Sequence, residues 1–199
     1  MKKRCILLRH GKTQGNIDKC YIGMKNDEPL CEIGIREIGL HKNEILSHIN
    51  ENIRVFSSPL MRAVKTAEMI FQDMDITVIE DLTEIDFGIF EGKNHKMLDG
   101  DPFYQKWLDS GGTLDIERAE KKSDFIERSM RGFMNALEGT RENEVAIIVC
   151  HGGNIMSVMS SLTGGNYYDY MVKNLEGYEL GIEYNNERIS DFTYNRISL

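Results

Sequence analysis

The chain has 199 residues, of which 41% are hydrophobic and 28% charged, values typical of a soluble globular protein. Its formal net charge is −8 at pH 7, which argues against broad nucleic-acid binding because that function needs a basic surface. The two most apolar runs, Cys5–Leu8 and Val145–Cys150, are too short for a signal peptide or a membrane span. We therefore expect one cytoplasmic domain over residues 1–199, a monomer or homodimer with no nucleic-acid or membrane partner.

The sequence contains no pattern typical of a metal site. Its four cysteines form no C-x-x-C pair, and no H-E-x-x-H segment or carboxylate cluster at ligand spacing is present. Cys5 and Cys150 lie within apolar runs, which predicts buried free thiols.

In chain order, the first predicted elements alternate between strand and helix. Residues 5–8 read as a buried strand, followed by a turn with glycines and a polar loop over 16–31. Apolar positions between 31 and 49 recur nearer to a helical period, which predicts a helix. A second strand is predicted over 53–57.

Ser58-Pro59 ends that second strand and is expected to begin a helix. Proline suits the first turn of a helix and serine is a favoured capping residue, so we predict a helix over 60–71 with Ser58 as its cap. The remaining predicted elements are a strand over 76–79, a loop over 81–100, helices near 101–109 and 121–138, a strand over 145–150, a helix over 153–162, and a hairpin or two edge strands over 178–197 around Asn185-Asn186. This alternation predicts a mostly parallel sheet covered by helices on both faces.

Two histidines stand where predicted strands end, at His10 and His151. Open α/β sheets hold their ligands at this edge, and the neighbouring Arg9 would suit an anionic substrate such as phosphate. A neutral imidazole with a fixed tautomer can attack phosphorus, while Thr13 and Asn16 could add hydrogen bonds from the same loop. Gly152, after His151, would let the backbone approach a ligand closely.

A third segment, at the start of the helix predicted over 60–71, adds a cation. Arg62 lies in its first turn, near a strand end, and can point at the same crevice. Phosphoryl transfer also needs a proton donor for the leaving oxygen. The candidates are five carboxylates after the third strand, among which the chemistry alone does not choose: Glu80, Asp81, Glu84, Asp86 and Glu91.

Four segments, taken together and in this order, resemble the histidine phosphatase superfamily, in the branch of cofactor-dependent phosphoglycerate mutase and its phosphatase relatives. The resemblance covers roughly residues 4–165. The segments are Arg9-His10-Gly11, Ser58-Pro59-Leu60-x-Arg62-Ala63, Glu84-x-x-Phe87-Gly88 with Glu91-Gly92, and His151-Gly152-Gly153.

The resemblance implies a three-layer α/β/α sandwich with a mostly parallel central sheet. It implies that His10 is the nucleophile, that Arg9, Arg62 and His151 form the phosphate pocket with Asn16, and that Glu84 is the general acid. It implies no metal ion or other cofactor. The chain departs from the family pattern at Lys12, where an acidic or amide residue is usual, which predicts a more basic pocket rim.

Phosphatase and mutase activities both belong to this family. The familiar Pro-x-Gly-Glu-Ser segment is absent, and only a modest cap-like segment around 93–125 is available to shield an intermediate from water. We therefore predict a metal-independent phosphatase of small phosphorylated metabolites, such as α-ribazole phosphate or a sugar or glycerate phosphate. The alternatives are phosphoglycerate mutase-type transfer and a non-catalytic phosphate-binding protein.

Overall fold

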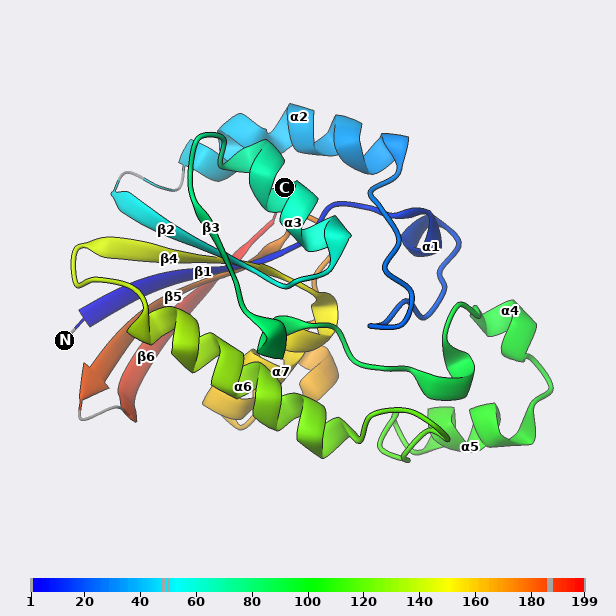
Figure 1. Ribbon diagram of the computed structural model, residues 1–199. Helices are drawn as coiled ribbons and strands as arrows, with labels where there is room; N and C mark the ends of the chain where they lie inside the picture. The colour runs from blue at the N-terminus through cyan, green and yellow to red at the C-terminus, as the bar shows by residue number, and fades with distance from the viewer. Residues whose placement is uncertain (1, 48, 50, 186–187, 199) are drawn as a thin grey trace.

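The computed structural model describes residues 2–47, 49, 51–185 and 188–198 around a six-stranded sheet with strand order β3-β2-β4-β1-β5-β6 (Figure 1). Neighbouring strands among the first four are parallel, while β5 pairs antiparallel with β1 and β6 pairs antiparallel with β5. The strands are β1 (Lys2–Arg9), β2 (Asn52–Ser57), β3 (Ile76–Val78), β4 (Glu144–Cys150), β5 (Gly177–Asn185) and β6 (Arg188–Ile197). The mostly parallel sheet and the C-terminal hairpin are thus confirmed, although Asn186 of the expected turn lies outside the described residues.

Helices cover both faces of this sheet, as predicted. Helices α2 (Glu32–Ser47) and α3 (Met61–Ile70) lie on one face, and α6 (Lys122–Glu138) and α7 (Gly152–Thr163) lie on the other (Figure 1). Alternate strand residues enter two separate hydrophobic clusters, because successive side chains of a strand point to opposite faces. The result is the expected three-layer α/β/α sandwich.

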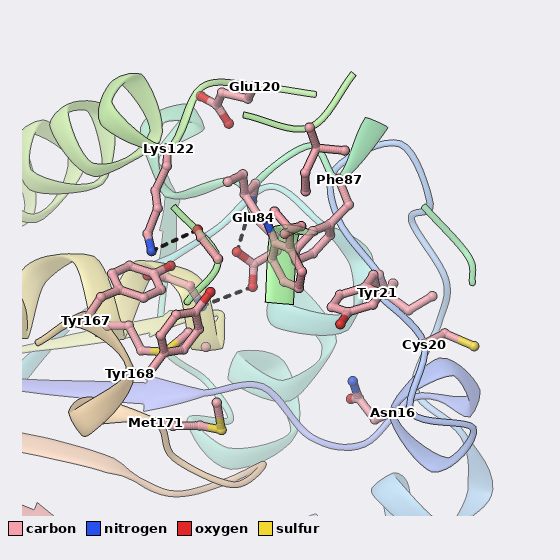
Figure 2. A pocket seen from close by; sticks show the side chains of 18 of the residues that line it. Asn16, Cys20, Tyr21, Glu84, Phe87, Glu120, Lys122, Tyr167, Tyr168 and Met171 are labelled. Carbon is pink, nitrogen blue, oxygen red and sulfur yellow. Dashed lines mark hydrogen bonds between the residues drawn. The ribbon is translucent and has the colours of Figure 1, made fainter. Parts of the chain in front are cut away.

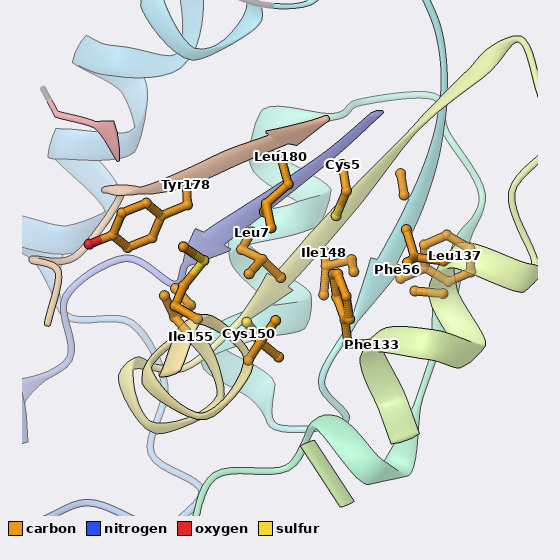
Figure 3. Packing of buried hydrophobic residues seen from close by; sticks show 14 of the residues in the cluster. Cys5, Leu7, Phe56, Phe133, Leu137, Ile148, Cys150, Ile155, Tyr178 and Leu180 are labelled. Atoms are coloured by element: carbon orange, nitrogen blue, oxygen red, sulfur yellow. The ribbon is translucent and has the colours of Figure 1, made fainter. Parts of the chain in front are cut away.

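The cluster beneath α6 and α7 shows how the sheet is anchored (Figure 3). Leu7 and Ile148 of the sheet pack there with Phe133 of α6 and Ile155 of α7. Strand β4 lies at the centre of the sheet, which explains why all six residues from Val145 to Cys150 are buried and apolar. Cys150 is a buried free thiol, as is Cys5.

A third, smaller cluster lies outside the sandwich and joins short elements that precede α6. Phe90, Leu98, Tyr104 and Trp107 form its buried centre. The short elements of the chain are α1 (Gln14–Ile17), η1 (Glu80–Leu82), η2 (Gly88–Phe90), α4 (His95–Leu98), α5 (Pro102–Asp109) and η3 (Tyr167–Tyr170). The stretch 81–100, predicted as loop, therefore contains parts of η1 and all of η2 and α4.

One local prediction was wrong. Helix α3 begins at Met61, and its N-cap is Leu60 with no side-chain capping bond, so Ser58 does not cap it. In α2, the apolar side chains of Ile35 and Leu40 face solvent, with 45% and 71% of their surface exposed. The apolar positions that indicated this helix therefore do not all belong to its buried face.

In the described part of the chain, no helix has the length and apolar character needed to cross a membrane.

Candidate active site

The edge at which β1 and β4 end brings the two predicted histidines together. Arg9 is the register partner of Cys150, so the next residue of each strand, His10 and His151, leaves the sheet at the same level. The His10 amide donates a hydrogen bond to the Cys150 carbonyl at 3.0 Å. The two imidazole rings are 5.0 Å apart, centroid to centroid, and meet edge to face. Parallel pairing of two strands thus places both histidines in one site.

The third strand of this edge supplies the partner of His151. Ser58 follows β2 and its amide donates to the Val149 carbonyl at 3.0 Å, which aligns it with the end of β4. The Ser58 hydroxyl lies 2.7 Å from Nε2 of His151 and also accepts from the Leu60 amide. Ser58 therefore orients the second histidine, a role that its position before a helix concealed in the sequence.

His10 is oriented by its own loop. Its Nδ1 lies 2.7 Å from the Gly11 carbonyl oxygen, which can only accept, so Nδ1 carries the proton and Nε2 keeps its lone pair. Burial, together with the positive charges of Arg62 and Arg9, holds the pKa of His10 well below its usual range. The side chain is therefore a neutral imidazole at pH 7, the form that a nucleophile requires.

The two arginines that favour this neutral state are themselves held in place by backbone carbonyls. Arg62 is 1% exposed and donates to the carbonyls of Asn26 and Gly23 at 3.1 and 3.2 Å. Arg9 donates from Nη1 to the Val172 carbonyl at 2.7 Å. Burial lowers the pKa of both guanidinium groups. Both groups remain charged at pH 7, because the pKa of an arginine is very high to begin with. Two fixed cations thus lie next to His10.

Glu84 lines the cavity and is buried. Its carboxylate accepts hydrogen bonds from the amides of Ile85 at 2.9 Å and Gly153 at 3.2 Å (Figure 2). A side chain at position 153 would collide with the carboxylate, since a Cβ there would lie 2.2 Å from Oε1. Burial raises the pKa of Glu84, against the lowering effect of these hydrogen bonds and the arginines. The carboxyl group therefore holds a proton to a higher pH than an exposed glutamate.

The structure separates Glu84 from the other candidate acids. Among the five carboxylates, only Glu84 lines the cavity. Asp81 pairs with Arg131, and the buried Asp86 pairs with Lys25. Glu91 accepts from the amides of Gly23 and Phe87, which fixes the loop that holds Arg62. Glu80 is exposed.

Asn16 lines the cavity, whereas Thr13 does not. Thr13 is fully buried, and its hydroxyl accepts from the Asn16 amide to cap α1. The Asn16 side-chain oxygen accepts from the Thr13 amide and from the side chain of Asn174, which leaves its NH₂ group for a ligand. Lys12, expected at the rim, is absent from the lining and pairs with Glu37 at 2.5 Å.

Asn174 is a functional candidate that the sequence analysis missed. Its side-chain amide donates to the His10 carbonyl at 2.9 Å and to the Asn16 side-chain oxygen at 3.0 Å. One residue thus fixes both the loop of His10 and the orientation of Asn16. Since 164 residues separate Asn174 from His10, no local pattern could have revealed this contact.

The site contains several groups that suit an anion. Gly152 lines the cavity and begins α7, so the positive end of that helix dipole faces the site. Two buried nitrogens, Arg9 Nε and His151 Nδ1, have no hydrogen-bond partner among the described residues. Buried polar atoms normally have a partner, so Arg9 Nε is a candidate phosphate ligand, as is His151 Nδ1 in the tautomer that protonates it.

We define Arg9, His10, Arg62, Glu84 and His151 as the phosphate end of the cavity, whose whole volume is about 280 Å³. Arg62 and His151 lie buried behind its surface, next to His10. Its outer part is lined by an aromatic wall that the sequence analysis did not anticipate (Figure 2). This aromatic wall consists of Tyr21, Phe87, Trp107, Tyr167 and Tyr168.

The model of the histidine phosphatase superfamily (branch 1) matches residues 5–193. The chain belongs to this family. Among relatives, it is 30% identical over 167 residues to a putative phosphoserine phosphatase 2 of Hydrogenobacter thermophilus, an alignment that covers 81% of this chain and 79% of that protein. It is 29% identical over 166 residues to the adenosylcobalamin/alpha-ribazole phosphatase of Escherichia coli, with the same coverage of 81% and 79%.

A solved structure supports the fold of this histidine phosphatase superfamily member. The structure of a phosphoserine phosphatase from Entamoeba histolytica, in complex with 3-phosphoglyceric acid, superposes with a TM-score of 0.77 at 25% identity. The superposition covers 96% of each chain. The family and the three-layer fold inferred from the four sequence segments are therefore confirmed.

Proposed function

We propose that this protein hydrolyses phosphate monoesters of small metabolites through a phosphohistidine on His10, without a metal ion. The observation that carries the proposal is the state of His10, whose protonated Nδ1 is fixed on the Gly11 carbonyl. Its Nε2 lone pair is thereby free, in a neutral ring that the positive charges of Arg62 and Arg9 influence directly. Membership of the histidine phosphatase superfamily and the names of the phosphatases among its relatives support this reaction class.

In the first step, Nε2 of His10 attacks phosphorus and the bond from phosphorus to the ester oxygen breaks. Arg9, Arg62, His151 and the NH₂ group of Asn16 hold the phosphoryl oxygens, on which negative charge accumulates. Glu84 donates its proton to the leaving oxygen, so the alcohol departs neutral. Fixed donors in a buried site stabilise such charge strongly because they need no reorganisation during the reaction.

In the second step, a water molecule attacks the phosphohistidine. Glu84, now ionised, accepts the proton of that water, and the bond from phosphorus to Nε2 breaks to release inorganic phosphate. His10 returns to its neutral form and Glu84 to its protonated form. The raised pKa of Glu84 suits both directions of transfer, because a catalytic pKa near the working pH gives efficient acid and base catalysis.

We also propose that residues 93–125 act as a small cap over the site. Trp107, Leu114 and Ile116 of this segment line the cavity. The proposed substrates are α-ribazole phosphate or a sugar or glycerate phosphate, and the E. coli relative named adenosylcobalamin/alpha-ribazole phosphatase supports the first of these.

The test is phosphate release from a panel of monoesters, with EDTA present, by the wild type and by His10→Ala. We expect EDTA-resistant release that the substitution abolishes, with unchanged circular dichroism. An acid-labile phosphoryl group on His10, detected by mass spectrometry after rapid quenching, would identify the intermediate. Release that His10→Ala retains, or that EDTA removes, would contradict the proposed mechanism.

The same panel separates the alternatives. Transfer of the phosphoryl group from a bisphosphoglycerate to a phosphoglycerate, in place of release to water, would indicate a mutase. Tight binding of orthovanadate or phosphate, without turnover of any monoester, would indicate a phosphate-binding protein.

A further inference from the structure

The part of the cavity beyond the phosphate end is apolar and largely aromatic. Figure 2 shows Tyr167 and Tyr168 on one side of Glu84, with Tyr21 and Phe87 on the other. The four come from different parts of the chain, the loop after α1, the loop after η1 and helix η3. The other apolar side chains that line the cavity are Ile22, Ile85, Trp107, Leu114, Ile116, Met156 and Met171.

Two charged groups of the outer lining, Glu120 and Lys122, are already engaged by the protein. Both oxygens of Glu120 accept from Arg128, at 2.6 and 2.8 Å. Nζ of Lys122 donates to the Gly112 carbonyl at 3.3 Å and lies 4.2 and 4.7 Å from the centres of the Tyr167 and Tyr168 rings. The Lys122 ammonium group therefore interacts with the wall, in a cation–π arrangement with the rings of Tyr167 and Tyr168.

The hydroxyl groups of Tyr167 and Tyr21 in the wall are engaged as well. The Tyr167 hydroxyl donates to the Gly153 carbonyl at 3.2 Å, and the Tyr21 and Tyr104 hydroxyls lie 2.9 Å apart. These bonds fix the rings of Tyr167 and Tyr21. A ligand would therefore contact the faces and edges of these rings. Aromatic groups stack well on such surfaces, in offset or edge-to-face geometry.

The charge balance of the outer cavity disfavours a leaving group that carries a carboxylate. Its charged lining residues are Lys122, Asp115 and Glu120, so the carboxylates outnumber the cation. A carboxylate on the leaving group could pair with Lys122 only by displacing that side chain from the Gly112 carbonyl and the tyrosine rings. An apolar group would instead lose its water against the aromatic wall, which is favourable in proportion to the buried area.

We propose that the alcohol released by this enzyme carries a flat aromatic ring, which the aromatic wall holds while the phosphoryl group occupies the phosphate end. This inference rests on the proposed function and specifies its substrate class. The cavity volume of about 280 Å³ lies near the lower end of the usual range for small-ligand sites, which suits a phosphate and a compact ring system.

The first test compares 2-phenylethyl phosphate with n-propyl phosphate and with 3-phosphoglycerate. The first two are esters of unactivated primary alcohols, so their leaving groups differ in the ring and little in chemistry. We expect kcat/KM for the phenylethyl ester to exceed that for the propyl ester at least about tenfold, since single methylene groups in apolar pockets already change kcat/KM by about 10–200-fold. Equal values, or a preference for 3-phosphoglycerate, would overturn the inference.

A matched pair of variants tests whether the wall is the cause. Tyr168 is 41% exposed and lines the cavity, whereas Tyr194 of β6 is 44% exposed and is not among the lining residues. We expect Tyr168→Ala to reduce the preference for the phenylethyl ester several-fold and Tyr168→Phe to retain it, with Tyr194→Ala unchanged. An identical preference in all of these variants would show that the ring faces do not select the substrate.

Failure of the proposed function leaves a distinct result. If no monoester is hydrolysed, titration calorimetry of 2-phenylethyl phosphate and n-propyl phosphate with His10→Ala still measures whether the wall favours binding of the ring. Tighter binding of the phenylethyl ester would then retain the ligand class while the catalytic proposal fails. Equal binding of both esters would reject the ligand class as well. Turnover that depends on His10, with no preference for the ring, would reject only the inference.

Discussion

The phosphate end and the aromatic wall are adjacent parts of one cavity, but different kinds of structure build them. The phosphate end stands on the carboxyl edge of the parallel strands, and Arg62, His10 and His151 are each at most 3% exposed. The aromatic wall comes from connecting segments, and its Tyr168 is 41% exposed. The ends of two strands therefore hold His10 and His151, while the segments around them hold what would recognise the rest of a substrate.

This difference suggests a division of the kinetic parameters. Changes at the phosphate end should reduce kcat, because its groups are expected to act on charge that develops in the transition state. Changes in the wall should raise KM, because its contacts are with a part of the substrate that does not react. Four predictions, taken from the largest expected effect to the smallest, can break or sharpen this comparison.

Glu84→Gln should give the largest selective loss. The amide cannot transfer a proton, so hydrolysis of an alkyl phosphate should slow by about 10²–10⁴-fold. Hydrolysis of p-nitrophenyl phosphate should slow far less, because its phenolate leaves without protonation. Stopped assays on both substrates make the comparison. Glu80→Gln is the control, since Glu80 is exposed and does not line the cavity. Equal losses on both substrates would exclude Glu84 as the acid.

The pH dependence of the wild type should follow from the same group. Burial raises the pKa of Glu84, so the proton donor persists above the usual carboxyl range and is lost as the pH rises through that raised value. The pKa of His10 is lowered, so its neutral form persists as the pH falls. We expect kcat for an alkyl phosphate to decline on the alkaline side, and Glu84→Gln to remove that decline. A limb that survives in the variant would belong to another group.

The two parts of the cavity also differed in how far the sequence could predict them. His10 and His151 follow short apolar runs that read clearly as strands, and parallel pairing then brings strand ends together regardless of their distance in sequence. The role of Ser58 could not be predicted, because its neighbour Pro59 equally suggests a capped helix. Its contact with His151 exists only once β2 and β4 are paired.

The wall and Asn174 lacked any local signal. Tyr167 and Tyr168 lie in a short 3₁₀ helix whose position depends on packing against α7, and Asn174 lies in an irregular segment. The fold was more predictable than these contacts, because buried strands such as β4 leave an apolar run in the sequence. In α2, Ile35 and Leu40 faced solvent, since apolar residues on both sides of a helix hide which face is buried.

Asn174→Asp should reduce kcat about tenfold and change KM little. Loss of the donor takes the Asn174 hydrogen bond from the His10 carbonyl and leaves the Asn16 side-chain oxygen with the Thr13 amide alone, at a cost of about 1–3 kcal/mol. The new negative charge should also raise the pKa of His10 and move the acidic limb of kcat to higher pH. Asn166→Asp, at an exposed position outside the cavity lining, is the control. A purely structural role for Asn174 would lower thermal stability and leave the acidic limb in place.

Lys122→Met should have the smallest effect and should report on the wall alone. The variant keeps the length of the side chain but removes its bond to Gly112 and its charge above Tyr167 and Tyr168. A cation–π contact contributes about 0.5–1 kcal/mol at exposed sites, so we expect KM for an aryl-alkyl phosphate to rise about two- to fivefold with kcat unchanged. Lys121→Met, at the exposed neighbouring position, should change neither parameter. A rise in KM confined to 3-phosphoglycerate would instead mean that Lys122 binds a substrate carboxylate, and the wall would then recognise charge rather than a ring.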